Sequence, residues 1–352
     1  MNSELNPQML TLARESRGMT QSDLADAADL TQGHVSKFES ATLPIPPDQL
    51  ERIARATSYP LGFFYRPDRI YGIGISYIYH RKRETIPAQD LKRILAQINT
   101  RSLEISAMLR GAELESENEF AHLDIADYNG DPSMVAKIVR AQWKMPMGPV
   151  ASVTATIEDA GGIVFHHHFG NRKFDGQSRW LNGLAPMFFM NSDSPADRDR
   201  FTLAHELGHI VMHRVPTNDM EREADRFAAE FLMPEREIID ELRPFSLERA
   251  AGLKLKWKVS VAAVVRRAFD LEIISESQYR RFNTQLSAAG YRVFDPIELD
   301  PEEPELVSDL IGVYQSEHCY SIKDLCQLTC LLESEFRAIY LPVSLGQLRM
   351  AN

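Results

Sequence analysis

Two histidines and a glutamate near the middle of the chain have the spacing of a zinc site. Within FTLAHELGHIVMH (residues 201–213), His205, Glu206 and His209 form the pattern H-E-x-x-H. The segment contains good helix formers and no proline, so we expect a helix with both imidazoles on one face, one turn apart. Both can then reach one zinc ion at about 2.0–2.1 Å, and Glu206 beside them can act as a general base towards zinc-bound water.

A third ligand must be found, because H-E-x-x-H alone also occurs without a metal. A metzincin would need a glycine and a further histidine where the sequence has Met212 and Val215, so that class is excluded. His213 lies about 12 Å along the helix axis from His205, too far to share its zinc. We expect His213 to be a packing residue or to support a ligand.

The stronger candidate is Glu221, at the start of the helical run EREADRFAAEFLMP (residues 221–234). Asp225 follows four residues later on the same helix face, where a carboxylate can orient a ligand histidine, as in gluzincins. Glu223 lies about 200° around the helix from Glu221, so only one of the two can face the metal. We favour Glu221 because it alone has a carboxylate one turn later, but the sequence leaves the choice open. The alternative is that these charged residues form a solvated helix face and bind no metal.

Two β-prone segments, residues 163–168 and 186–190, predict a small sheet beside the zinc helix. The edge of such a sheet can bind the backbone of a substrate. Residues 187–191 are our candidate for part of this sheet. The first segment ends in three histidines, of which at most His166 and His168 could act together, because neighbours on a strand face opposite ways. We expect structural or surface roles for them, with support of a transition-state oxyanion as the alternative.

The N-terminal region has a different pattern, in RGMTQSDLADAADLTQGHVSKFES (residues 17–40). Thr20 and Asp23 are typical of a capping box at the start of one helix, and residues 32–39 predict a second helix after a short turn. In a helix-turn-helix the exposed side of this second helix enters the major groove of DNA. The residues on that side are Gln32, Gly33, His34, Ser36 and Lys37.

The charge of this region does not favour DNA. Residues 1–68 contain six Arg and Lys against nine Asp and Glu, a net charge of −3. Neutralisation of phosphates supplies much of the affinity for DNA, so a single copy should bind weakly. We expect a homodimer, or the basic residues 81–83, to compensate. A helical domain that binds protein is the alternative.

Both regions resemble known families. FTLAHELGHIVMH followed by EREADRFAAEFLMP resembles the ImmA/IrrE metallopeptidases, over residues 150–234. The resemblance implies that His205, His209 and Glu221 hold zinc, that Glu206 is the general base, and that the substrate is a repressor-type protein. Residues 17–40 resemble the helix-turn-helix of Cro and phage-repressor-type (XRE) regulators, which implies binding to a DNA operator.

These patterns together predict a mainly α protein with a small β-sheet. The expected regions are a helix-turn-helix domain at 1–68, a linker segment with a long helix at 69–131, a zincin-like zinc metallopeptidase domain at 132–293, and a helical region at 294–352. Residues 71–80 should be extended. Residues 260–269 should form an amphipathic helix with Arg266 and Arg267 outward. The sequence reveals no role for the C-terminal helices.

The leading hypothesis is a cytoplasmic, zinc-dependent regulatory endopeptidase fused to a DNA-binding domain. The net charge of −11 argues against a broadly cationic surface that binds nucleic acid. No apolar run approaches the ~20 residues of a membrane span. Three cysteines, an odd number, fit a reducing compartment. The rival is a non-proteolytic regulator or antitoxin whose zinc-site domain is a sensor or dimerisation platform. Glu206 favours the enzyme, because a scaffold needs no base.

Overall fold

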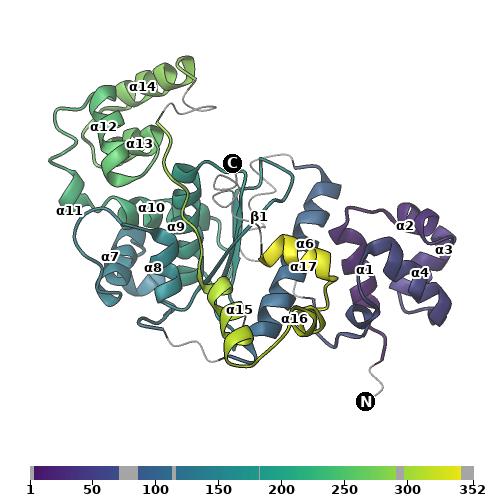
Figure 1. Cartoon of the computed structure of the whole chain (residues 1–352). Helices are drawn as coiled ribbons and strands as arrows, with labels where there is room; N and C mark the ends of the chain where they lie inside the picture. The colour runs from purple at the N-terminus through teal and green to yellow at the C-terminus, as the bar shows by residue number, and fades with distance from the viewer. Residues whose placement is uncertain (1–3, 71–85, 113–115, 182, 291–296, 342–352) are drawn as a thin grey trace, which may run out of the picture. The chain divides into compact units, whose positions relative to one another are not determined.

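The computed structural model describes residues 4–70, 86–112, 116–181, 183–290 and 297–341 (Figure 1). These residues are mainly helical with one small sheet, so the predicted fold class is confirmed. Residues 4–70, 86–112 and 306–341 form one compact unit, and the described residues of 116–305 form the other. The domain limits drawn from the sequence stay a prediction. The expected extended segment 71–80 and the basic residues 81–83 lie outside the described residues.

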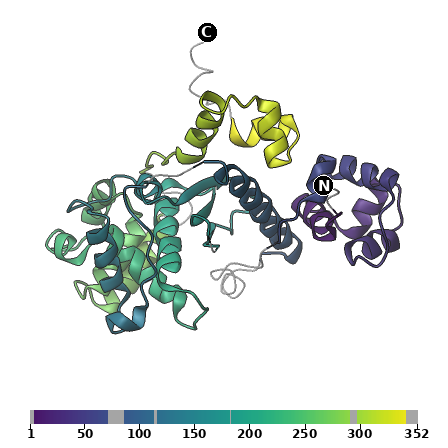
Figure 2. The ribbon, with the colours of Figure 1, turned by 90° about the horizontal axis from the view of Figure 1, so that it is seen from below.

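The first unit begins with a cluster of short helices, coloured purple in Figures 1 and 2. These are α1 (Pro7–Ser16), α2 (Gln21–Ala27), α3 (Gln32–Glu39), α4 (Pro47–Thr57) and the 3-10 helix η1 (Leu61–Tyr65). The predicted capping box of α2 is confirmed, because the side chains of Thr20 and Asp23 each accept the other's backbone N–H. Asp29, with φ of 52°, turns the chain towards α3. Leu24 and Val35, on the two helices that the turn joins, are both fully buried, and these helices contact each other.

The rest of the first unit is a long helix and three later helices. They are α6 (Ala88–Leu109), α15 (Leu306–Ser316), α16 (Ile322–Thr329) and α17 (Glu333–Tyr340). Helix α6 contacts α1 on one side and both α15 and α16 from the end of the chain. Ile94, Ile98 and Ile105 of α6 are fully buried, as expected for a helix covered by several neighbours.

The second unit is built around a pair of crossing helices, α9 (Ala196–Met212) and α10 (Met220–Leu232). Around them lie η2 (Ile125–Tyr128), α7 (Pro132–Gln142), α8 (Val153–Asp159), α11 (Glu235–Ile238), α12 (Leu247–Trp257), α13 (Val261–Asp270) and α14 (Glu276–Ala288). Helix α9 also contacts two strands of the sheet, and α10 contacts α7. The expected helix over residues 201–213 is therefore found, beginning five residues earlier.

The sheet contains β1 (Ile163–His167), β3 (Met187–Asn191) and β2 (Gly176–Arg179), in that spatial order. Strand β1 runs parallel to β3, with Ile163 opposite Met187, and β2 runs antiparallel to β3, with Ser178 opposite Phe188. The prediction that residues 187–191 belong to the sheet is confirmed. They form its central strand, β3, and β1 and β2 lie on either side of it.

Close approach of α9 and α10 depends on a glycine inside the H-E-x-x-H segment. A Cβ atom on Gly208 would lie only 3.1–3.3 Å from side-chain atoms of Phe227 on α10. Phe227 is fully buried, as are Leu203 and Leu207 of α9. Glycine costs helix stability of about 1 kcal/mol relative to alanine. Here it lets the two helices pack closely enough for side chains of α10 to reach those of α9.

One expectation for α13 is wrong. Arg266 is outward and pairs with Asp270 on its own helix, but Arg267 is buried and pairs with Glu230 of α10. Arg267 also donates from Nε to the carbonyl of Met233, at 3.0 Å. Glu230 is itself buried, and an unpaired buried carboxylate would be costly. The need to neutralise Glu230 explains why one of two adjacent arginines turns inward.

Candidate metal centre

Helix α9 presents the two predicted histidines side by side. The Nε2 atoms of His205 and His209 lie 3.0 Å apart, and both residues are buried. Glu221, in the first turn of α10, reaches the same point from the other helix. Its Oε1 lies 3.3 Å from Nε2 of His209, and its Oε2 lies 3.6 Å from Nε2 of His205. The three residues therefore offer ligand atoms within 4.8 Å of one another.

These distances can be compared with the geometry of zinc. Four tetrahedral bonds of about 2.0–2.1 Å place neighbouring ligand atoms about 3.4 Å apart. The two imidazole nitrogens lie 3.0 Å apart, and the two oxygens of Glu221 lie 3.3 Å from His209 and 3.6 Å from His205. Two imidazole nitrogens and a carboxylate are also donors that zinc prefers. The residues present thus fit a zinc ion.

The charges around the histidines also favour a cation. Burial lowers the pKa of His205, but hydrogen bonds with Asp225 and Glu221 outweigh it and raise that pKa to about 10. Burial raises the pKa of Glu221, yet its hydrogen bonds with His205 and His209 hold it well below its usual range. The site therefore stabilises positive charge, and a divalent ion would take the place of a proton.

A second layer of contacts orients both histidines. Nδ1 of His205 lies 2.9 Å from Oδ1 of Asp225, the contact expected from the sequence. Nδ1 of His209 lies 3.0 Å from Nδ1 of His213, whose Nε2 lies 3.0 Å from Oε2 of Glu223. Contacts of this kind select the tautomer that leaves the other nitrogen free for a metal.

The same contacts distinguish Glu221 from Glu223, the two candidate ligands between which the sequence could not decide. Glu221 lies against His205 and His209, whereas Glu223 lies against His213. His213 follows the last residue of α9, and its extended backbone turns the ring back towards His209. Burial, with the charges of neighbouring histidines, lowers the pKa of His213 to about 3. His213 is therefore a neutral hydrogen-bond partner of His209. Support of a ligand was one of the two roles expected for it from the sequence.

Glu206 is fully buried on the sheet side of α9. Its Oε2 accepts hydrogen bonds from the backbone N–H of Ser178, at 2.8 Å, and from the Ser178 hydroxyl, at 2.6 Å. Its Oε1 is buried without a hydrogen-bond partner among the described residues. Two donors on one oxygen fix the orientation of the carboxylate, while the other oxygen stays available as an acceptor.

Sequence reasoning missed Ser178 because its strand carries no strand signal. Residues 176–179 read GQSR, without a β-branched or aromatic side chain. All four are nevertheless buried, so polar side chains face neighbours on both sides of β2. The available signal is indirect: a short polar segment between two β-prone ones is a candidate for a strand that holds a charged residue.

The helix-turn-helix residues lie together on α3. Thr31 caps this helix by accepting the backbone N–H of His34, at 3.2 Å. Four of the predicted DNA-contacting residues are exposed, and Ser36 is half-buried. The exposed ones are Gln32, Gly33, His34 and Lys37. Gln32 also donates to the side chain of Gln21 on α2, at 2.7 Å, which links the two helices of the motif.

The consecutive histidines at residues 166–168 do not belong to the group of candidate metal ligands. Nε2 of His166 lies 3.0 Å from Oδ2 of Asp199, and Nδ1 of His168 lies 2.9 Å from Oδ1 of Asp193. Burial lowers the pKa of His166, but the hydrogen bond and charge of Asp199 outweigh it and raise that pKa above its usual value. His166 therefore fastens β1 to the start of α9.

This pair makes stability depend on pH. Because the pKa of His166 is higher in the folded chain, its stabilisation is complete below the unfolded value of about 6.5. It is lost as the pH rises through the folded value. We expect the free energy of unfolding to fall less between pH 6 and 8.5 in His166→Gln than in the wild type, in urea titrations followed by tryptophan fluorescence. His168→Gln, at an exposed pair, should behave as wild type. Equal pH dependence in all three proteins would contradict this role.

Comparison with known families covers both functional regions. Residues 10–64 match a helix-turn-helix family, and residues 157–269 match a peptidase family described as the IrrE N-terminal-like domain. The chain thus has the domain order of a DNA-binding regulator that carries a peptidase-family domain. More specifically, an XRE-type helix-turn-helix precedes an ImmA/IrrE-type domain. No curated protein matches the sequence. Among the described helices, none is both long and apolar enough to span a membrane.

Proposed function

We propose that the chain is a zinc-dependent endopeptidase that regulates transcription by cleaving a repressor-type protein. The observation that carries this proposal is the convergence of His205, His209 and Glu221, with ligand atoms within 4.8 Å, beside the buried carboxylate of Glu206. Zinc, when bound there, polarises a carbonyl group and lowers the pKa of water to about 7. The remaining chemistry belongs to side chains of the protein.

Glu206 is the proton carrier in this proposal. Its Oε1, which has no hydrogen-bond partner among the described residues, accepts a proton from the attacking water. It then delivers that proton to the nitrogen of the leaving amine. Ser178 holds the other oxygen through two hydrogen bonds and keeps the carboxylate oriented during both transfers. Asp225 and His213 hold the rings of His205 and His209 in the tautomers that bind metal.

Strand β2 supports a role in binding an extended substrate. Within the described residues it pairs only with β3 and so ends the sheet. Its Ser178 contacts the proposed base directly, so an extended peptide bound beside β2 would lie close to Glu206. An extended backbone is therefore the expected form of the bound substrate.

The fusion to a helix-turn-helix supports a regulatory substrate. A peptidase joined to a DNA-binding region can act at a promoter, or on a repressor of the same structural type. The test is to incubate zinc-loaded protein with purified helix-turn-helix repressors and to record intact masses. Discrete fragments from one repressor support the proposal. Repressors that stay intact while one binds tightly support the antitoxin or sensor alternative.

DNA binding through α3 has a separate expected result. Lys37→Ala should weaken binding to a duplex selected from a random pool, and should reduce the slope of log affinity against log salt by about 0.9. Fluorescence anisotropy at several salt concentrations measures both quantities. Arg55→Ala removes the same charge from the exposed side of α4 and should leave the slope unchanged. An equal effect of both substitutions would show that α3 is not the contacting helix.

A further inference from the structure

The last described helices repeat the geometry of the N-terminal helix-turn-helix. Residues 321–341 align with residues 20–40 without a gap, at a constant difference of 301 positions. Helix α3 begins and ends at 32 and 39, and α17 begins and ends at 333 and 340. Helix α2 begins at 21 and α16 at 322. Every boundary except the end of the first helix therefore corresponds.

The turns and caps correspond as well. Ser321 and Asp324 form a capping box, as Thr20 and Asp23 do. Cys330 has φ of 58°, where Asp29 has 52°. In both motifs the residue after this left-handed position donates its backbone N–H to a carbonyl of the preceding helix. These bonds run from Leu331 to Cys326, at 3.0 Å, and from Leu30 to Ala25, at 2.8 Å.

The buried positions of the two motifs also match. Leu24 and Leu325 are fully buried at the same place in the first helix. Val35 and Phe336 are fully buried at the same place in the second helix. A matching turn and a matching core are what define a helix-turn-helix, so the similarity is structural although few residues are identical.

We infer that residues 321–341 are a second helix-turn-helix, whose second helix binds protein instead of DNA, and that its partner is α1 and α6 of the same chain. The inference concerns the first unit alone and does not depend on the peptidase proposal.

The residues of α17 at the DNA-reading positions do not suit DNA. Glu333 and Glu335 stand where α3 has Gln32 and His34, and Ala338 stands where α3 has Lys37. Carboxylates at these positions would repel the phosphates that supply much of DNA affinity. The remaining cation, Arg337, is already paired with Glu333 on its own helix, at 2.8 Å.

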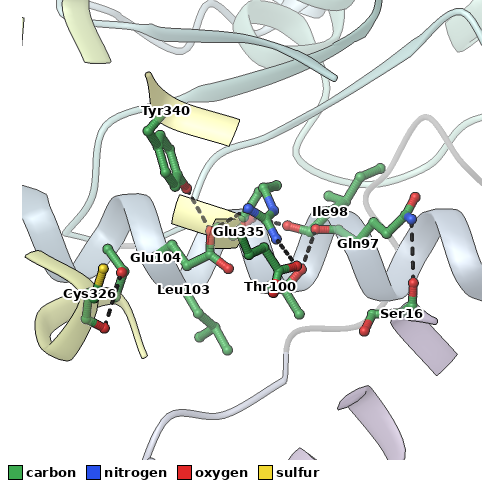
Figure 3. A network of polar contacts seen from close by, with 12 residues as sticks. Ser16, Gln97, Ile98, Thr100, Leu103, Glu104, Cys326, Glu335 and Tyr340 are labelled. Carbon is green, nitrogen blue, oxygen red and sulfur yellow. Dashed lines mark hydrogen bonds and ion pairs between the residues drawn. The ribbon is translucent and has the colours of Figure 1, made fainter. Parts of the chain in front are cut away.

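Glu335 instead makes a protein contact. Its two oxygens accept hydrogen bonds from Nη1 and Nη2 of Arg17, at 2.7 and 2.8 Å, a bidentate pair at the end of α1. One of them also lies 3.9 Å from Arg101 of α6. Figure 3 shows Glu335 and Tyr340 pointing from α17 towards α6, where the Tyr340 hydroxyl donates to Oε2 of Glu104, at 2.6 Å.

A third contact joins α16 to the same surface. Arg66, which follows η1, donates to the carbonyl of Thr329 at 3.1 Å and to the carbonyl of Leu103 on α6 at 3.0 Å. The arginine is buried. The second motif is therefore held against the end of α1, the end of η1 and α6 by polar groups from each of its helices.

The docking is tested by hydrogen–deuterium exchange of the full chain. Glu335→Gln should speed exchange in residues 321–341 and in the last turn of α1 by about tenfold, because the paired charge is lost. Glu333→Gln is the matched control on the exposed side of α17, and should change exchange less than about twofold. Arg17→Gln should reproduce the effect of Glu335→Gln. Unchanged exchange in Glu335→Gln would overturn the docking.

The choice of protein over DNA is tested by anisotropy with duplex DNA. The double variant Ser334→Ala, Arg337→Ala alters exposed positions of α17 and leaves Glu335 in place. Its affinity for the duplex should stay within about twofold of the wild type, since no base or phosphate contact is removed. A loss of more than about fivefold would show that α17 contacts DNA, and would overturn the inference.

Discussion

Glutamine in place of Glu206 is expected to reduce cleavage by about 10²–10⁴-fold while zinc stays bound. Glutamine has nearly the same shape and can still accept the hydrogen bonds that Ser178 donates. It cannot carry a proton from water to the leaving amine. The measurement is the initial rate of substrate cleavage by intact mass, beside the zinc content of both proteins by elemental analysis.

Two controls separate chemistry from folding in this variant. Glu206 is fully buried, so its replacement also alters packing and charge inside the second unit. The unfolding midpoint of Glu206→Gln should therefore be compared with that of the wild type at equal zinc content. Full cleavage activity in a folded, zinc-loaded Glu206→Gln protein would eliminate Glu206 as the base.

Removal of the Glu221 carboxylate is expected to have the largest effect on zinc affinity. Glu221→Ala takes away a carboxylate whose two oxygens face His209 and His205, and should raise the dissociation constant for zinc by more than about 100-fold. Glu223→Gln alters a group that contacts only His213 within this cluster, and should raise it by about tenfold or less. Competition with a chelator of known affinity measures both constants.

The order of these two effects decides between the glutamates. A larger effect of Glu223→Gln than of Glu221→Ala would mean that α10 turns its other face to the metal in the bound state. Dissociation constants that are equal in both variants and the wild type would exclude both glutamates as ligands.

Local signals explain how much of the site could be predicted from the sequence. The spacing of His205 and His209 acts within one helical turn, so the helix alone brings their rings together. Asp225 could be predicted for the same reason, because its relation to Glu221 is local to α10. The capping box at Thr20 likewise needs only residues that are three positions apart.

What could not be predicted depends on contacts between elements. The sequence favours Glu221 but cannot decide against Glu223, because that decision depends on how α10 crosses α9, where Gly208 packs against Phe227. Ser178 could not be predicted because polar residues form its strand. The inward turn of Arg267 follows from the buried charge of Glu230 on another helix.

The second helix-turn-helix was hidden for another reason. Between residues 20–40 and 321–341 the identical residues are Asp, Leu and Leu, at 23, 24 and 30 and again at 324, 325 and 331. Those residues serve the cap and the core, which many unrelated helix pairs share. The left-handed turn at Cys330 becomes visible only in the backbone.

Removal and return of zinc in the wild-type chain test the central claim most directly. The metal is removed with a chelator, and cleavage of a repressor substrate is then measured as zinc is restored in steps. We expect no cleavage without zinc, and a linear rise in cleavage rate that ends at one zinc per chain. Cleavage that persists in the zinc-free protein, or a fully loaded protein that cuts no repressor, would contradict the proposal of a zinc-dependent regulatory peptidase.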